Sequence, residues 1–233
     1  MHPTDKAARV AGALYLSLVV TAPLSLIYIP RTLIVTGNAT ATAKHILAHE
    51  VLFRLGIVAD LISTVIFIFL VMALYRLLSG VNKTHASLMV ILALVSVAIG
   101  FMNVLNNIAA LTLFRGSDFL AVFEKPQLDA LAMLFLHLHG QGNVINGIFW
   151  GLWLFPFGVL VMRSGFLPRI LGVLLIVNCF AYLAISLTSL LQPGYSTVVS
   201  RVALLPMAAG ELSIIAWLLI KGAQVQPLAA AAS

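Results

Sequence analysis

The chain contains 233 residues, of which 62% are hydrophobic and 9% are charged. Soluble domains carry about 25% charged residues, and a soluble fold of this length has too little interior to bury so many apolar side chains. The composition therefore excludes a soluble protein and predicts one embedded in a lipid bilayer. The net charge of +6 is not concentrated in a basic cluster with interleaved aromatic residues, so we expect no nucleic-acid partner.

Six apolar runs predict an all-α, polytopic membrane protein, because a helix that spans a bilayer needs about 20 apolar residues. The first run is too long for the apolar segment of a secretion signal, which has about 7–15 residues. It contains Pro23, which should kink the helix. The expected spans cover residues 8–29, 51–77, 87–113, 143–162, 170–191 and 202–221.

The segment 118–139 lies between the third and fourth spans and contains many apolar residues. Pro126 follows Glu124 and Lys125, which is typical of a helix start. We therefore expect an extra helix here, which either lies on the outer surface or extends the fourth span. The six spans predict a single transmembrane domain over residues 1–222, followed by a disordered tail over 223–233 that contains Pro227.

An even number of spans places both termini on the same side of the membrane, and positive charge indicates which side. With the N-terminus inside, the inner segments hold seven Lys and Arg residues and the outer segments hold five. We therefore expect both termini in the cytoplasm. The inner set is Lys6, Arg9, Arg76, Lys83, Arg163, Arg169 and Lys221, and the outer set is Arg31, Lys44, Arg115, Lys125 and Arg201.

Charged residues inside a span are candidates for function, because each costs about 2.5–3.5 kcal/mol in hydrocarbon. Glu50 and Arg54 are four residues apart on one helical face, and we interpret them as an ion pair at the headgroup level. Asp60 lies about 9 Å deeper than Arg54. Its position fits a functional carboxylate and a packing contact with a neighbouring helix equally well.

Asn103, Asn106 and Asn107 share one face of the third span. Amides of this kind join membrane helices, and three on one face would also suit the lining of a wet cavity.

The stretch that begins "LHLHGQGNVINGIFWGLWLF" at residue 136 combines polar and aromatic residues on the fourth span. His139, Asn143 and Asn146 form one stripe of a continuous helix, which Trp150 and Trp153 continue. His137 and His139 are about 200° apart around a helix. They would bind one metal ion only if the backbone were unwound, so we expect no metal and no cofactor.

Gly147 and Gly151 form a GxxxG contact face, which favours a neighbouring helix or a second copy of the chain.

Glu211 is alone in the sixth span, about 15 Å from its inner end. A carboxyl group at that depth must pair with a cation, accept hydrogen bonds or stay protonated. Arg54 is its nearest cation by depth. Since buried polar groups must meet partners or water, we hypothesise that spans two, three, four and six converge on one polar cavity that opens outward. Its candidate residues are Glu50, Arg54, Asp60, Asn103, Asn106, Asn107, His137, His139, Asn143, Asn146, Trp150 and Glu211.

Short sequence motifs are spread along most of the chain, from about Arg9 to Gly222. They are Arg9-Val10-Ala11-Gly12 with Tyr15-Leu16, the Glu50, Arg54 and Asp60-Leu61 spacing, Leu74-Tyr75 with Leu77-Leu78, Leu136-His137 with Gly140, Phe149 to Pro156 ("FWGLWLFP") and Ser164 to Arg169 ("SGFLPR"). Together they resemble the bacterial DUF4386 family of six-helix integral membrane proteins. The resemblance implies six spans and a bacterial inner membrane, and it implies no activity, substrate or cofactor.

Three functions fit these observations. The first is the binding of a small molecule or a membrane lipid in the polar cavity. The second is a structural, sensory or assembly subunit, in which amides and the GxxxG face serve helix contacts. The third is a metal-assisted intramembrane hydrolase that uses His137 or His139 with Asp60 and Glu211. An enzyme is the less favoured class, because the sequence contains neither an HExxH nor a GxSxG motif.

Overall fold

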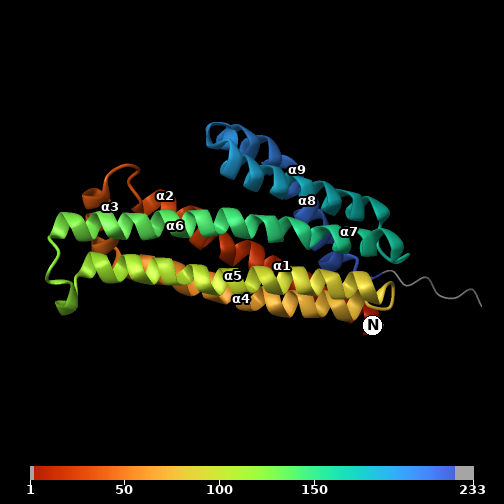
Figure 1. Cartoon of the computed structure of the whole chain (residues 1–233). Helices are drawn as coiled ribbons and strands as arrows, with labels where there is room; N and C mark the ends of the chain where they lie inside the picture. The colour runs from red at the N-terminus through yellow and green to blue at the C-terminus, as the bar shows by residue number, and fades with distance from the viewer. Residues whose placement is uncertain (1–2, 224–233) are drawn as a thin grey trace, which may run out of the picture. The chain divides into compact units, whose positions relative to one another are not determined.

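The computed structural model describes residues 3–223, and within this range every regular element is a helix (Figure 1). Six of the helical runs are long and apolar enough to cross a membrane, and they confirm the predicted all-α, six-span class. These runs are Thr4–Leu33, Glu50–Leu78, Lys83–Arg115, Lys125–Arg163, Arg169–Leu191 and Pro193–Ile220.

The first span combines α1 (Pro3–Pro23), a π-helical turn η1 (Leu24–Tyr28) and α2 (Ile29–Leu33). The irregularity expected at Pro23 takes the form of this wider turn. Within it the backbone N–H of Ile29 donates to the carbonyl of Leu24, five residues earlier. Pro30 follows at once and has no N–H to donate, so the regular α-helical pattern is interrupted here on two counts.

A short helix, α3 (Ala39–Ala48), precedes the second span and was not predicted from the sequence. Its first turn is capped by Asn38, whose side-chain oxygen accepts a hydrogen bond from the N–H of Ala41 at 2.9 Å. The second and third spans are then single long helices, α4 (Glu50–Leu78) and α5 (Lys83–Arg115).

The fourth span begins much earlier than residue 143. After a short 3-10 helix, η2 (Asp118–Leu120), the chain forms α6 (Lys125–Leu152) and α7 (Leu154–Arg163). The separate surface helix is therefore not confirmed, and residues 125–139 extend the fourth span. Pro156 explains why α6 stops at Leu152, because it has no N–H to donate to the carbonyl four residues earlier.

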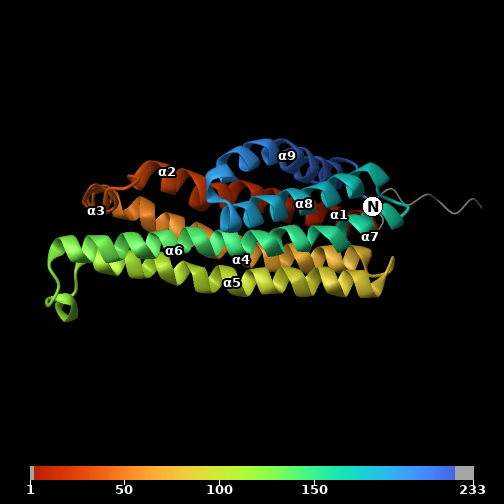
Figure 2. The same cartoon turned by 45° about the horizontal axis from the view of Figure 1, so that its top comes forward.

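The fifth span is α8 (Arg169–Leu191), and the sixth is η3 (Pro193–Tyr195) followed by α9 (Ser196–Ile220). Figure 2 shows α8 and α9 side by side, and α7 packs against α8 as well. Gly158 of α7 and Gly172 of α8 allow a close approach of the two backbones. A Cβ atom on Gly158 would lie only 2.6 Å from the carbonyl oxygen of Gly172.

The described chain divides into two compact units, and each is treated by itself below. Among residues 3–223, unit 1 contains residues 3–16, 67–96 and 147–223, and unit 2 contains residues 17–66 and 97–146. The first four spans contribute to both units, whereas α8 and α9 belong to unit 1. The single domain over 1–222 stays a prediction, and the expected disorder of the tail concerns residues 224–233, which lie outside the described range.

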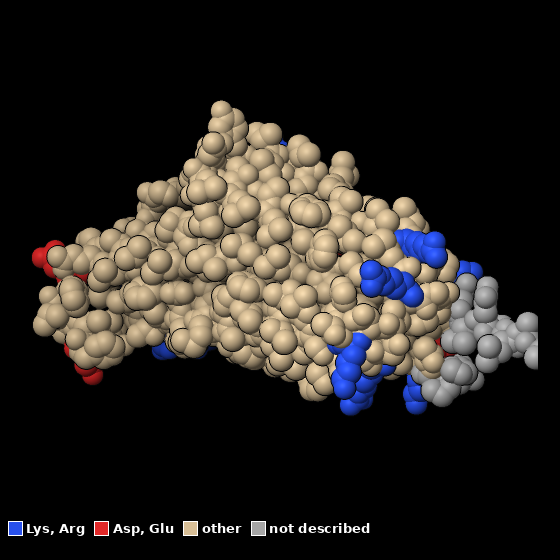
Figure 3. All heavy atoms as spheres, turned by 45° about the vertical axis from the view of Figure 1, so that its right-hand side comes forward, with Lys and Arg blue, Asp and Glu red and all other residues tan. Residues whose placement is uncertain are grey.

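The two units differ in charge. Unit 1 holds eight of the 13 Lys and Arg residues and two of the seven Asp and Glu residues, whereas unit 2 holds five of each kind. The whole net charge of +6 therefore belongs to unit 1. Figure 3 shows Lys and Arg side chains gathered on the face near the two ends of the described chain. In unit 1, Lys83 and Arg169 are the first residues of α5 and α8. Arg163 is the last residue of α7, and Lys221 follows the last residue of α9.

Candidate functional site

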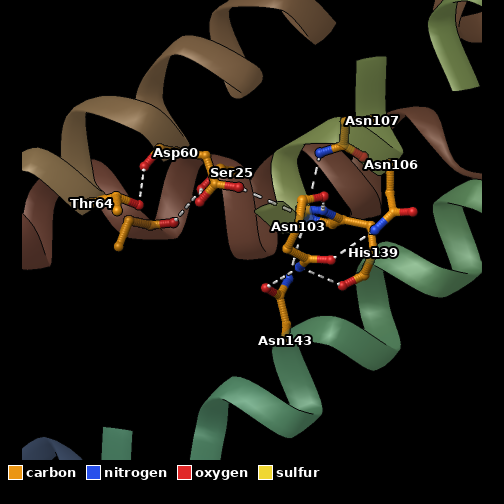
Figure 4. Close-up of polar contacts among 9 residues, drawn as sticks. Ser25, Asp60, Thr64, Asn103, Asn106, Asn107, His139 and Asn143 are labelled. Atoms are coloured by element: carbon orange, nitrogen blue, oxygen red, sulfur yellow. Dashed lines mark hydrogen bonds and ion pairs between the residues drawn. The ribbon is translucent and has the colours of Figure 1, made fainter. Parts of the chain in front are cut away.

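Polar side chains from four helical elements of unit 2 meet in one place, which we call the Asp60 cluster (Figure 4). Its members come from η1, α4, α5 and α6, so it lies among the first four spans. They are Ser25, Asp60, Asn103, Asn106, Asn107, His139 and Asn143.

Asn103 is the centre of this network and is only 6% exposed. Its amide nitrogen donates to the backbone carbonyl of His139 at 2.9 Å and to the side-chain oxygen of Asn143 at 3.0 Å. Its own side-chain oxygen accepts a hydrogen bond from Asn106 at 3.0 Å. The absence of a side chain on Gly142 leaves room for Asn103, since a Cβ atom there would overlap the Asn103 amide. These contacts join α5 to α6.

The two ring nitrogens of His139 have different partners. Nδ1 lies 3.2 Å from the carbonyl oxygen of Asn103. A carbonyl only accepts, so Nδ1 carries the hydrogen. In the neutral ring, Nε2 is then the acceptor, and the amide nitrogens of Asn143 and Asn107 lie 3.3 and 3.4 Å from it. The same Nε2 lies 3.8 Å from Oδ2 of Asp60, so an imidazole and a carboxyl group are neighbours here.

Asp60 has weak partners for a carboxyl group inside a span. Ser25 of the π-helical turn donates to its Oδ1 over a long distance of 3.4 Å, and the 3.8 Å separation from His139 exceeds hydrogen-bond range. An ionised carboxylate has about four acceptor sites. With only these two distant neighbours, the carboxyl group of Asp60 has acceptor sites left for a further donor. The Asp60 side chain is 18% exposed, so a ligand could reach it.

Unit 1 contains a second polar group, the Glu211 cluster, which consists of Glu211, Tyr15 and Tyr182. Tyr182 of α8 donates its hydroxyl to Oε1 of Glu211 at 2.9 Å, and Tyr15 of α1 donates to Oε2 at 3.0 Å. Both carboxyl oxygens are therefore satisfied by phenol groups. The partner suggested by depth, Arg54, instead pairs with Glu50 at 2.7 Å.

Aromatic rings surround the Glu211 cluster. Trp150 meets Tyr182 edge-on with ring centroids 6.5 Å apart, and Trp153 lies 6.2 Å from Tyr15. Trp153 also stacks on Phe157 at 5.5 Å. The aromatic continuation of the fourth-span stripe is thus a packing element of unit 1.

The remaining predicted residues lie outside both clusters. Glu50 and Arg54 form the expected ion pair, which Arg115 joins at 3.6 Å from the same oxygen of Glu50. His137 is exposed, and its Nε2 lies 3.5 Å from the side-chain nitrogen of Gln141. Asn146 is 3% exposed, and its side-chain oxygen has no hydrogen-bond partner.

The GxxxG face of the fourth span packs within the chain. A Cβ atom on Gly147 would lie 2.6 Å from the hydroxyl of Ser186, and one on Gly151 would lie 2.8 Å from the carbonyl of Cys179. Both partners belong to α8, so this face is covered in the monomer. A homo-oligomer formed through Gly147 and Gly151 stays a prediction, and it would require α8 to move away.

Some members of these clusters were missed from the sequence. Tyr15, Tyr182 and Ser25 are common residues in apolar helices, and nothing in their spacing reveals a distant carboxyl group as partner. Arg115 was counted only as an outer cation, although its position at the end of an apolar run signals a headgroup-level charge. Among residues 3–223 no group of three or more His, Cys, Asp and Glu could hold a metal ion.

Six apolar helical spans, with polar side chains hydrogen-bonded between helices in each unit, define a multi-pass α-helical membrane protein. More particularly, the chain belongs to the family described as "Domain of unknown function (DUF4386)", whose model matches residues 10–222. The resemblance found in the sequence strings is thereby confirmed. No curated protein and no solved structure matches the chain.

Proposed function

We propose that this membrane protein binds a small molecule that donates hydrogen bonds or carries a positive charge, and that Asp60 is the residue that accepts it. The observation that carries the proposal is the under-occupied carboxyl group of Asp60, whose partners lie 3.4 and 3.8 Å away. A carboxyl group inside a span is costly unless it is satisfied. An ammonium or guanidinium group would supply the missing donors.

Neighbouring groups suit such a ligand. The side chain of His139 is only 9% exposed, and its ring contacts the backbone carbonyl of Asn103. The position of the ring next to Asp60 is therefore fixed by the protein. The side-chain amides of Asn107 and Asn143 lie next to the same ring and add hydrogen-bonding groups to the site. That Glu211 and the sixth span share one cavity with this cluster stays a prediction.

A structural role is the second candidate, and the hydrogen bonds of Asn103 favour it. Its amide joins α5 to α6 through the carbonyl of His139 and the side chain of Asn143. Hydrogen bonds between membrane helices stabilise their association by about 0.6 kcal/mol each. In this role the cluster would hold helices together without a ligand.

Thermal unfolding of the detergent-solubilised protein distinguishes the two candidates. We expect at least one of ethanolammonium, choline, putrescine and guanidinium to raise the Tm of the native chain. A ligand at a hundred times its Kd adds about 2.7 kcal/mol, which corresponds to about 5–10 °C for a chain of this size. Asp60→Asn should abolish the increase, because the amide lacks the charge and offers fewer acceptor sites.

Asp118→Asn is the matched control, since Asp118 is exposed on η2 and lies outside the cluster. This variant should keep the full ligand-induced increase. An equal increase in Asp60→Asn, or none of the four cations stabilising the native chain, would favour the structural role.

We further propose a bacterial inner-membrane location with both termini in the cytoplasm. Seven Lys and Arg residues near the proposed inner ends of the spans, against five on the outer side, support this orientation, because Lys and Arg near span ends are retained on the cytoplasmic side. The seven are Lys6, Arg9, Arg76, Lys83, Arg163, Arg169 and Lys221. A fluorescent protein fused after Ser233 should fold and fluoresce. Alkaline phosphatase inserted at Ser117 should be active, because that loop would face the periplasm. The reverse pattern of reporter signals would contradict the orientation.

A further inference from the structure

A groove in unit 2 lies between the start of α4 and the end of α5 and has a volume of about 390 Å³. Its polar end is formed by Arg54 and Arg115, and its apolar part includes Ile57, Val58 and Ile108. It shares no residue with the Asp60 cluster. The volume lies at the small end of the range for ligand pockets, about 300–1,000 Å³, so the groove would hold a headgroup and the first part of an attached chain.

The polar end of the groove carries unbalanced positive charge. One oxygen of Glu50 accepts from Nε of Arg54 at 2.7 Å and lies 3.6 Å from Nη1 of Arg115. Two guanidinium groups thus share one carboxylate, which leaves a local charge of +1. Both arginine side chains are about half exposed, at 50% and 56%, so most of their donors are free. A ligand with a single negative charge would complete the balance.

The apolar part of the groove is also open. Val58 is 47% exposed and Ile108 is 44% exposed, and both belong to membrane-spanning helices. Arg115 ends one span, and Arg54 lies one turn inside the other. The arginines are therefore at headgroup level, with apolar surface beginning directly beneath them. This order of charge and apolar surface matches the order of groups in a phospholipid.

We propose that this groove binds a membrane lipid whose headgroup is an anionic phosphodiester. The phosphate oxygens accept hydrogen bonds from Arg54 and Arg115, since guanidinium groups match the geometry of phosphate. The beginning of an acyl chain lies along Ile57, Val58 and Ile108. A free phosphate ion has the same anionic oxygens but no acyl chain. Binding of the lipid should therefore depend on the apolar part of the groove, whereas binding of free phosphate should not.

Native mass spectrometry of the intact protein released from detergent micelles tests the proposal, with phosphatidylglycerol as the added lipid. We expect the native chain to retain one lipid molecule. The Arg54→Gln/Arg115→Gln variant should bind it at least about tenfold more weakly, because charge-assisted hydrogen bonds to the phosphate are lost. Arg163→Gln/Arg169→Gln removes two arginines next to the ends of unit 1 helices and should bind as the native chain does.

Three further arms identify the ligand. Phosphatidylcholine should bind more weakly than phosphatidylglycerol, because its headgroup has no net charge. Ile108→Trp should reduce lipid binding with both arginines intact, because the indole fills the apolar half of the groove. Inorganic phosphate in large excess should not displace the lipid.

The proposal is overturned if the two double variants bind phosphatidylglycerol equally well, if phosphatidylcholine binds as tightly, if Ile108→Trp binds as the native chain does, or if inorganic phosphate displaces the lipid. Should Arg54→Gln/Arg115→Gln fail to fold, Arg115→Gln alone keeps the close Arg54–Glu50 ion pair and must still weaken binding. Failure here leaves the proposed ligand of Asp60 untouched, since that test uses other residues and other compounds.

Discussion

Replacing Tyr15 and Tyr182 together by phenylalanine is expected to lower the free energy of unfolding by about 2–6 kcal/mol. Each hydroxyl donates to one oxygen of Glu211, at 3.0 and 2.9 Å. Leaving a buried hydrogen-bonding group without its partner costs about 1–3 kcal/mol, and the double variant removes two partners while the carboxyl group stays between helices. Unfolding of the purified protein in mixed micelles, followed by circular dichroism, measures the change.

Two further variants test the cause of that loss. Adding Glu211→Leu to the double variant should recover much of the stability, because removing both partners of a buried hydrogen bond costs less than removing one. Tyr28→Phe/Tyr195→Phe changes two tyrosines that are 53% and 65% exposed, and should stay within about 0.5 kcal/mol of the native chain. A loss below about 1 kcal/mol in Tyr15→Phe/Tyr182→Phe would show that the hydroxyls contribute little.

The second large effect is expected at the contact between α7 and α8. Gly158→Ala should destabilise the protein by about 1–3 kcal/mol, the usual cost of overpacking a tight interface. The new Cβ atom would lie 2.6 Å from the backbone oxygen of Gly172 and 2.8 Å from Cγ1 of Ile176. A backbone atom cannot turn away as a side chain does, so α8 must shift as a whole. The same unfolding measurement reports the change.

Gly140→Ala provides the matched control. Gly140 is also helical, in α6, and a Cβ atom there would meet nothing within 4 Å. Alanine favours a helix over glycine by about 0.8–1.0 kcal/mol, so this variant should be neutral or slightly stabilising. If both alanine variants were equally stable, the close approach of α7 and α8 would not be an energetic constraint.

The spans were predictable from the sequence because bilayer thickness sets the length of an apolar run. The expected ends of the second and fifth spans, 51–77 and 170–191, differ by at most one residue from the ends of α4 and α8. The fourth span begins at residue 125 and not at 143, which agrees with the alternative that the segment before it extends this span. There the polar residues around His137 and Gln141 interrupt the apolar run, although hydrogen bonds and protein contacts satisfy them within one continuous helix.

The pairing of helices was not predictable in the same way. Spacing correctly indicated that Glu50 and Arg54 share a face, since that contact is local. Tyr15 and Glu211 are 196 residues apart, and no local pattern connects them. Depth alone suggested Arg54 as the partner of Glu211, because depth orders residues along the membrane normal and carries no information about their position around the bundle.

The π-helical turn Leu24–Tyr28 determines which side chains of the first span face the interior of unit 2. Within it, the Ser25 hydroxyl donates to Asp60. After it, Ile29 and Leu33 are 5% and 1% exposed in an apolar core. Deleting one residue of the turn would rotate the following segment by about 100° relative to the preceding one. The span would keep its apolar character and lose its alignment, so a single-codon deletion there should be far more harmful than hydropathy alone would suggest.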